Sequence, residues 1–260
     1  MSVNIAIQLE TPSELNNKVD QSKKPAGLCT RFAYGVANRI KGFSLGVAAA
    51  GVITPLTSGT TYLGQKIGLI PEFTKENNIQ GMVANFQKMG FSELNADRLI
   101  NATCYFKELS QQLNLHVIRT PDGWERMNTT PEYLKGEAIG FFTGAALEEE
   151  ILFRGLIQNV CLTRIPKFVI KKISPGKETI LDTTMAKAAR ILITSAAFSA
   201  YHLRNKGIFS DSYVSMQLVA TFMMGIGFGL LKESQAGLAG AIGAHITNNL
   251  AATSHVFWSC

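Results

Sequence analysis

The sequence predicts an all-α protein, a polytopic transmembrane helical bundle with a polar cavity inside it. Three observations support this prediction: long uncharged stretches, a mean hydropathy of +0.12 and a charged fraction of only 17%. An ordinary soluble domain carries about 25% charged residues. The alternative is a soluble helical protein with apolar core helices. It is less favoured because two uncharged stretches of 20 residues or more lie close together.

The chain is predicted to have four parts in order. Residues 1–41 form a polar arm with six Lys or Arg against three Asp or Glu. Residues 42–66 are a candidate transmembrane segment, because no charge occurs between Lys41 and Lys66, although Pro55 and five glycines interrupt the run. Residues 67–136 have balanced charges and form a polar insertion outside the membrane. Residues 137–260 form a membrane-embedded core.

Within the core, residues 212–231 and 234–260 are the strongest transmembrane candidates. Each contains 20 or more residues without Asp, Glu, Lys or Arg, which is enough to cross the hydrocarbon as a helix. Residues 138–162 and 190–203 are also apolar but carry ionisable side chains, and we expect these side chains to face the bundle interior. With residues 42–66, the chain has about five membrane-embedded segments.

The distribution of Lys and Arg predicts the orientation of the chain. The amino-terminal arm is basic, and residues 164–190 contain seven Lys or Arg against two acids, so both are expected on the cytoplasmic side. Two membrane crossings, near residues 42–64 and 138–162, would bring the chain from the basic arm back to the cytoplasm at the second basic segment. The net charge of +6 requires no nucleic acid, because these segments can meet the anionic headgroups of a lipid bilayer. The sequence therefore predicts an integral membrane protein with a cytoplasmic amino terminus.

A triple-glutamate motif interrupts the first core segment. Glu150 and Arg154 lie four residues apart and can pair on one face of a helix. Glu149 is rotated from Glu150 by about 100° and cannot share that arginine equally well. We therefore expect Glu150 to be a structural anion and Glu149 to be available as a general base. Glu148 is expected near the helix end or in solvent.

Two further motifs place polar residues on one helix face through the same four-residue spacing. Phe198 can pack beside His202 and orient the imidazole. His245 and Asn249 point an imidazole and a carboxamide at one spot, where both can donate hydrogen bonds to a developing oxyanion. Polar groups on separate apolar segments are costly in hydrocarbon, so the three motifs are predicted to share one cavity.

The motifs EExxxR, FxxxH and HxxxN, in this order on successive apolar helices, resemble the CAAX-protease and bacteriocin-processing family of intramembrane glutamic endopeptidases, which includes Rce1-type prenyl-protein proteases. The resemblance covers about residues 137–255 and implies a helical bundle whose cavity opens toward the cytoplasm. By position, it implies that Glu149 and His202 activate water, and that His245 and Asn249 form an oxyanion hole. Three residues would support the site: Glu150, Arg154 and Phe198.

The leading interpretation is a membrane-embedded endopeptidase that hydrolyses a peptide or protein substrate without a cofactor. A carboxylate, two imidazoles and an amide suffice for direct attack by water, and no Ser or Cys lies in a recognisable nucleophile motif. In a second interpretation Glu149, His202 and His245 bind a zinc ion and leave one position for water. In a third, the protein is a non-catalytic membrane adaptor or immunity protein whose polar cluster only joins helices.

Overall fold

The computed structural model describes residues 28–92, 94–102, 108, 112, 117–120, 123–126 and 131–257. The chain divides into two compact units, Met1–Asn38 and Arg39–Cys260. Residues 1–27, which make up most of the predicted basic arm, lie outside the described part of the chain.

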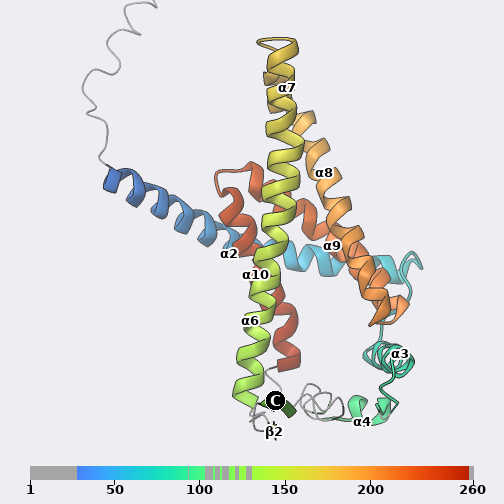
Figure 1. Ribbon diagram of the computed structural model, residues 1–260. Coiled ribbons are helices and arrows are strands. Elements are labelled where there is room, and N and C mark those ends of the chain that lie inside the picture. Colours follow the sequence, from blue (N-terminus) through green and yellow to red (C-terminus); the bar gives the residue numbers. More distant parts are fainter. Residues whose placement is uncertain are drawn as a thin grey trace, which may run out of the picture. The chain divides into compact units, whose positions relative to one another are not determined.

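The described residues are almost entirely helical, which confirms the predicted all-α class (Figure 1). In chain order the elements are α2 (Leu28–Lys66), α3 (Lys75–Lys88), α4 (Ala96–Ile100), β1 (Val117–Thr120), β2 (Gly123–Arg126), α6 (Pro131–Glu150), η1 (Ile151–Arg164), α7 (Ile165–Ile173), η2 (Glu178–Asp182), α8 (Thr184–Tyr201), η3 (His202–Gly207), α9 (Asp211–Glu233) and α10 (Gly237–Phe257). The two strands form a short antiparallel hairpin within the polar insertion.

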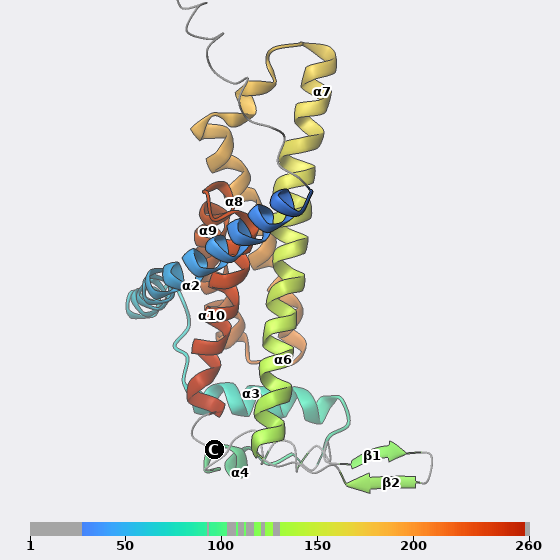
Figure 2. The same cartoon turned by 90° about the vertical axis from the view of Figure 1, so that its left-hand side faces the viewer.

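Helix α6, the π-helical segment η1 and helix α7 follow one another without a break and form one long rod (Figure 2). The backbone N–H of Ile165 donates to Val160 O, the five-residue spacing that defines a π-helix. The first motif lies at the transition, because Glu150 ends α6 and Arg154 lies within η1. Stretches of π-helix are rare and often occur at functional sites, and no periodicity in the sequence predicted this one.

Two helices of the described part are long and apolar enough to cross a membrane, judged by length and composition: Phe32–Lys66 and Asp211–Glu233. The second corresponds to the predicted segment 212–231, and the first contains the predicted segment 42–66. Helix α10 corresponds to the predicted segment 234–260, but it carries polar residues such as His245 and Asn248 and is not one of these two helices. The core is a bundle of membrane helices, several of which carry polar side chains inward.

Helix α2 packs along α10 through small residues spaced four positions apart. A Cβ atom on Gly42 would lie 2.4 Å from Ala236 O, and one on Gly46 would lie 1.9 Å from Gly240 O. Small residues allow helix backbones in membranes to approach this closely. Further along, the Thr54 hydroxyl donates to Asn248 Oδ1 at 3.0 Å. Both helices therefore run in the same direction along this contact.

The polar insertion has a small apolar core of its own. Five buried side chains of α3, α4 and the turn between them form it: Ile79, Met82, Val83, Leu94 and Leu99. Thr74 and Asn95 cap the two helices by accepting hydrogen bonds from backbone N–H groups three residues later. Local packing and capping thus make α3 and α4 a compact pair.

Substitution of Gly46 tests the close contact between α2 and α10. Because the new Cβ would overlap a backbone carbonyl of Gly240, Gly46→Ala should destabilise the fold by about 2 kcal/mol or more. Gly51→Ala is the matched control in the same helix, since nothing lies within 4 Å of its added Cβ. Thermal unfolding in detergent measures both variants. Equal melting temperatures for the two variants would show that α2 does not pack here.

Candidate active site

The first and third motifs meet at the carboxylate of Glu150. Its Oε1 atom accepts a hydrogen bond from Arg154 Nη1 at 3.0 Å and lies 2.9 Å from His245 Nδ1. Glu150 and Arg154 are fully buried, and His245 is only 3% exposed. The predicted pairing of Glu150 with Arg154 is confirmed. The contact with His245 was not predicted, and it joins the first motif to the third.

Glu149 flanks the opposite side of the same imidazole. Its Oε2 atom lies 3.7 Å from His245 Nε2, and its Oε1 atom lies 4.0 Å from Arg204 Nη2. Its side chain is 13% exposed, whereas that of Glu150 is fully buried. The two adjacent glutamates therefore differ in burial, and only Glu150 pairs with Arg154, as predicted. Glu148 is exposed on the surface of α6, also as predicted.

Two phenylalanines enclose the buried arginine. The Arg154 guanidinium lies 4.5 Å from the ring centre of Phe198 and 5.4 Å from that of Phe228. Phe228 also stacks on His245, with ring centres 4.9 Å apart. Desolvated cation–π contacts of this kind contribute about 2 kcal/mol. Phe198 was predicted to orient a histidine, but the role of Phe228 was missed because its partners come from other helices.

His202 lies directly after the last residue of α8 and is oriented by Phe198 in two ways. Its Nδ1 atom is 2.9 Å from the Phe198 carbonyl oxygen, and the two ring centres are 5.0 Å apart. A carbonyl only accepts hydrogen bonds, so Nδ1 carries the proton. In the neutral ring Nε2 is then the proton acceptor. Phe198 also contacts His245, with ring centres 5.6 Å apart, and so links the two histidines.

Asn249 lies one helical turn after His245 on α10, as its spacing predicted. Its Nδ2 atom donates to the backbone oxygen of Phe142 on α6 at 3.3 Å. The neighbouring Asn248 is 6% exposed and accepts from Thr54 on α2. The two consecutive amides therefore tie α10 to two different helices.

Arg204 is a candidate functional residue that the sequence analysis missed. Its guanidinium lies 3.8 Å from the ring centre of Tyr201 and hydrogen-bonds to the Tyr201 hydroxyl. The side chain is 58% exposed and lies beside Glu149. Glu149 was expected to lack a fixed cation, and the structure places this exposed arginine next to it. The two positions lie 55 residues apart, so helical spacing cannot reveal their contact.

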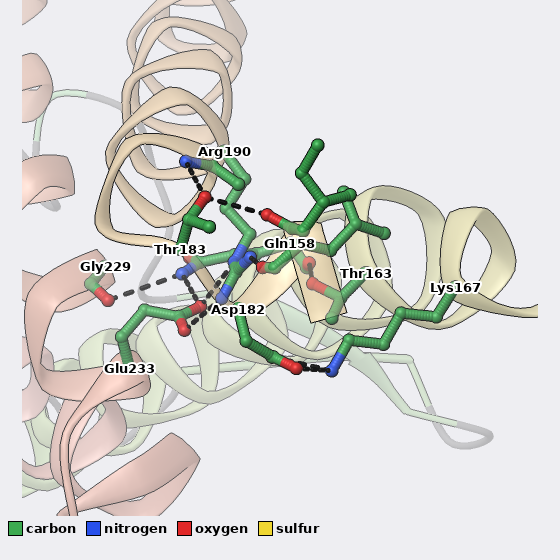
Figure 3. Close-up of polar contacts among 11 residues, drawn as sticks. Gln158, Thr163, Lys167, Asp182, Thr183, Arg190, Gly229 and Glu233 are labelled. Carbon is green, nitrogen blue, oxygen red and sulfur yellow. Dashed lines mark hydrogen bonds and ion pairs between the residues drawn. The ribbon is translucent and has the colours of Figure 1, made fainter. Parts of the chain in front are cut away.

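A second buried polar cluster lies further along the same rod (Figure 3). Gln158 Nε2 donates to Gly229 O at 3.3 Å and to Glu233 Oε1 at 2.9 Å. Arg190 holds both oxygens of the Glu233 carboxylate, and its Nε atom lies 2.9 Å from Oε1. Gln158 follows Arg154 by four residues. This spacing is the one signal in the sequence that could have placed Gln158 on the same helix face as the buried Arg154.

Among the described residues, no three His, Cys, Asp or Glu side chains converge closely enough to hold a metal ion. This includes Glu149, His202 and His245, the three ligands of the zinc interpretation. The charged groups that do converge are arranged as ion pairs and hydrogen bonds around His245. Their arrangement provides a partly exposed carboxylate beside a buried, fixed imidazole.

The sequence comparisons cover the part of the chain that contains this site. Residues 134–251 match the sequence model of the family described as type II CAAX prenyl endopeptidase Rce1-like. Neither the curated proteins nor the solved structures contain a match. The matched region includes all three motifs and most of each helix that carries them. Residues 134–251 are therefore similar to the Rce1-like family, which is the family that the motifs resemble.

Proposed function

We propose that this protein is an intramembrane endopeptidase in which Glu149 activates the attacking water. The observation that carries the proposal is the position of His245 between two unequal carboxylates. Glu150, fully buried, lies at Nδ1, and Glu149, partly exposed, lies at Nε2. Among the described residues, Glu149 has ionic neighbours only at 3.7 and 4.0 Å, which is beyond hydrogen-bond distance. This carboxylate can therefore accept a proton from water without breaking a fixed bond.

The reaction needs one water molecule and two proton transfers. Glu149 takes a proton from the water while the water oxygen attacks the carbonyl carbon of the peptide bond. The proton then passes to the amide nitrogen, the C–N bond breaks, and the products are a carboxylic acid and an amine. His202 supports the proton transfers through Nε2, because its Nδ1 proton is held by the Phe198 carbonyl.

His245 and Asn249 are proposed to stabilise the oxyanion of the tetrahedral intermediate. Nδ1 of His245 donates to Glu150, so donation from Nε2 as well requires a ring that carries both protons. The positive charge of this ring then faces Glu149 and Glu150. Asn249, one turn further along α10, supplies the second donor. Removal of one such donor typically costs about 3 kcal/mol of transition-state stabilisation.

The proposed substrate is a peptide or protein that reaches the site within the lipid bilayer. The family description names CAAX prenyl endopeptidases, so a farnesylated peptide with a CAAX terminus is the first probe. The same peptide without the prenyl group shows whether the lipid is required. If neither peptide is cleaved, a comparison of membrane-peptide termini in cells with wild-type protein and with Glu149→Gln identifies the substrate directly.

Glu149→Gln tests the proposed base. It should lower kcat/KM by about 10²- to 10⁴-fold, because the amide cannot take the proton from water. Glu148→Gln is the matched control on the exposed surface of the same helix and should keep full activity. Both variants should keep the wild-type melting temperature. Wild-type rates in purified Glu149→Gln would rule out the proposed base.

Arg154 substitutions distinguish an enzyme from an adaptor. Arg154→Ala strands the buried Glu150 carboxylate and should cost about 3 kcal/mol or more of stability. The double variant Glu150→Gln with Arg154→Met leaves no stranded charge and should be more stable than Arg154→Ala alone. Abundance and melting temperature measure both effects. An adaptor would tolerate Glu149→Gln with an intact cellular phenotype, whereas an endopeptidase would lose its phenotype at wild-type abundance.

Metal analysis of the purified protein tests the zinc alternative. The metal-free reaction predicts full activity in the presence of a chelator, because every proposed proton acceptor and donor is a side chain of the protein. Stoichiometric zinc, together with chelator-sensitive activity that added zinc restores, would instead support a site of Glu149, His202 and His245.

A further inference from the structure

Helix α2 lies outside the region that matches the Rce1-like family, yet it packs against the helix that carries the third motif. The match begins at residue 134, whereas α2 ends at Lys66. Helix α10 carries both His245 and Asn249. The contacts of α2 with α10 therefore link a part of the chain without family similarity to two residues of the candidate site.

The two helices keep one register along their contact. Three contacts share the same separation of 194 positions in the sequence: Gly42 with Ala236, Gly46 with Gly240, and Thr54 with Asn248. From the first to the last contact, each helix advances by about 18 Å. A constant separation over this length means that the helices run in parallel and do not rotate away from each other. Thr54 therefore reaches α10 at a height that the closely packed glycines determine.

Helix α2 also supports the aromatic ring that stacks on His245. Ala50 is 3% exposed and belongs to one apolar cluster with Phe228 of α9, and Ile53 packs against this cluster. A Cβ atom on Gly227, next to Phe228, would lie 2.9 Å from Ile53 Cδ1. Phe228 in turn stacks on His245. The middle of α2 therefore packs against the ring that covers the buried imidazole.

Two consecutive amides of α10 are held by two different helices. Asn248 is 6% exposed and accepts a hydrogen bond from Thr54 of α2 at 3.0 Å. Asn249 donates from Nδ2 to Phe142 O of α6 at 3.3 Å. Consecutive side chains of a helix point about 100° apart. The two hydrogen bonds therefore oppose a rotation of α10 about its own axis in either direction.

We propose that Thr54 is a positioning residue for the oxyanion donor Asn249. A carboxamide nitrogen carries two protons. One proton of Asn249 points to Phe142 O, and the proposed reaction directs the second to the oxyanion. The bond from Thr54 fixes the rotation of α10 and with it the direction of this second proton. The effect on catalysis rests on the proposed function, whereas the effect on the Asn249 side chain does not.

Three variants of the full-length protein isolate the Thr54 hydroxyl. Thr54→Val removes the hydroxyl with little change in shape, and Thr54→Ser keeps a hydroxyl at the same place. Thr60→Val is the matched control, because the Thr60 hydroxyl donates to Leu56 O within α2. A contact that only joins α2 to α10 would change the melting temperature of Thr54→Val and leave the Asn249 side chain and kcat unchanged.

The side-chain NH₂ signals of asparagine test the positioning directly and require no substrate. Selective ¹⁵N labelling of asparagine displays these signals, and the pair that disappears in Asn249→Ala identifies Asn249. Thr54→Val should shift this pair, because the second proton changes direction when α10 rotates. Thr54→Ser and Thr60→Val should leave it at the wild-type position. An unshifted pair in Thr54→Val would overturn the inference.

Kinetics of the same variants test the catalytic consequence, with the farnesylated CAAX-terminal peptide as the probe. Thr54→Val should lower kcat about 3- to 10-fold at an unchanged KM, because a misdirected donor weakens transition-state binding alone. Thr54→Ser should restore the wild-type kcat. In the Asn249→Ala background, Thr54→Val should cause no further loss of kcat, because its effect passes through Asn249.

The outcomes separate the inference from the proposed function. A loss of kcat of equal size in the Asn249→Ala background would overturn the inference, and so would a wild-type kcat in Thr54→Val when Asn249→Ala is impaired. A wild-type kcat in Asn249→Ala would instead remove Asn249 from the proposed oxyanion hole. In that case, or if the peptide is not cleaved, the shift of the Asn249 signals alone decides whether Thr54 positions this side chain.

Discussion

The buried ion pair of Glu150 and Arg154 is the interaction on which the rest of the site depends. A charge without a partner inside the bundle would cost several kcal/mol, so each residue fixes the other. Arg154 also donates to Gly225 O at 3.2 Å, and Glu150 also binds His245. A single pair thus fixes the positions of α9 and α10 relative to the rod of α6 and η1. Glu149 is placed correctly only because its neighbour is held this firmly.

Two glycines of α9 allow η1 and α8 to pack closely against this helix. Arg154 and Gln158 donate to the carbonyls of Gly225 and Gly229, so a four-residue step on η1 matches a four-residue step on α9. The other side of both glycines packs closely against α8, where a Cβ on Gly229 would lie 2.9 Å from an Ile191 side-chain carbon. Close backbone approach and buried hydrogen bonds therefore depend on the same residues, as in other membrane bundles.

The sequence could predict contacts within one helix but not the contacts between helices. Glu150 with Arg154 and Phe198 with His202 follow from a four-residue spacing, which helix geometry converts directly into proximity. The contact of His245 with Glu150 depends on how two helices rotate and slide against each other. No local spacing encodes that rotation. The π-helical segment was missed as well, because the spacing of the sequence was interpreted with the 3.6-residue period of an α-helix.

The orientation of such a bundle is independent of its buried chemistry. The contacts of the ion pair with His245, Gly225 and the two phenylalanines would be the same if the bundle were inserted the other way, because they lie between helices inside the bundle. Orientation is instead determined by Lys and Arg outside the hydrocarbon, which sit here in residues 164–190 and before α2. Family motifs can therefore identify the residues of a site and still leave the side of its opening undetermined. In this protein Glu150, Arg154 and Gln158 are fully buried, whereas the neighbouring Glu149 is partly exposed, and this difference follows from the packing of the helices alone.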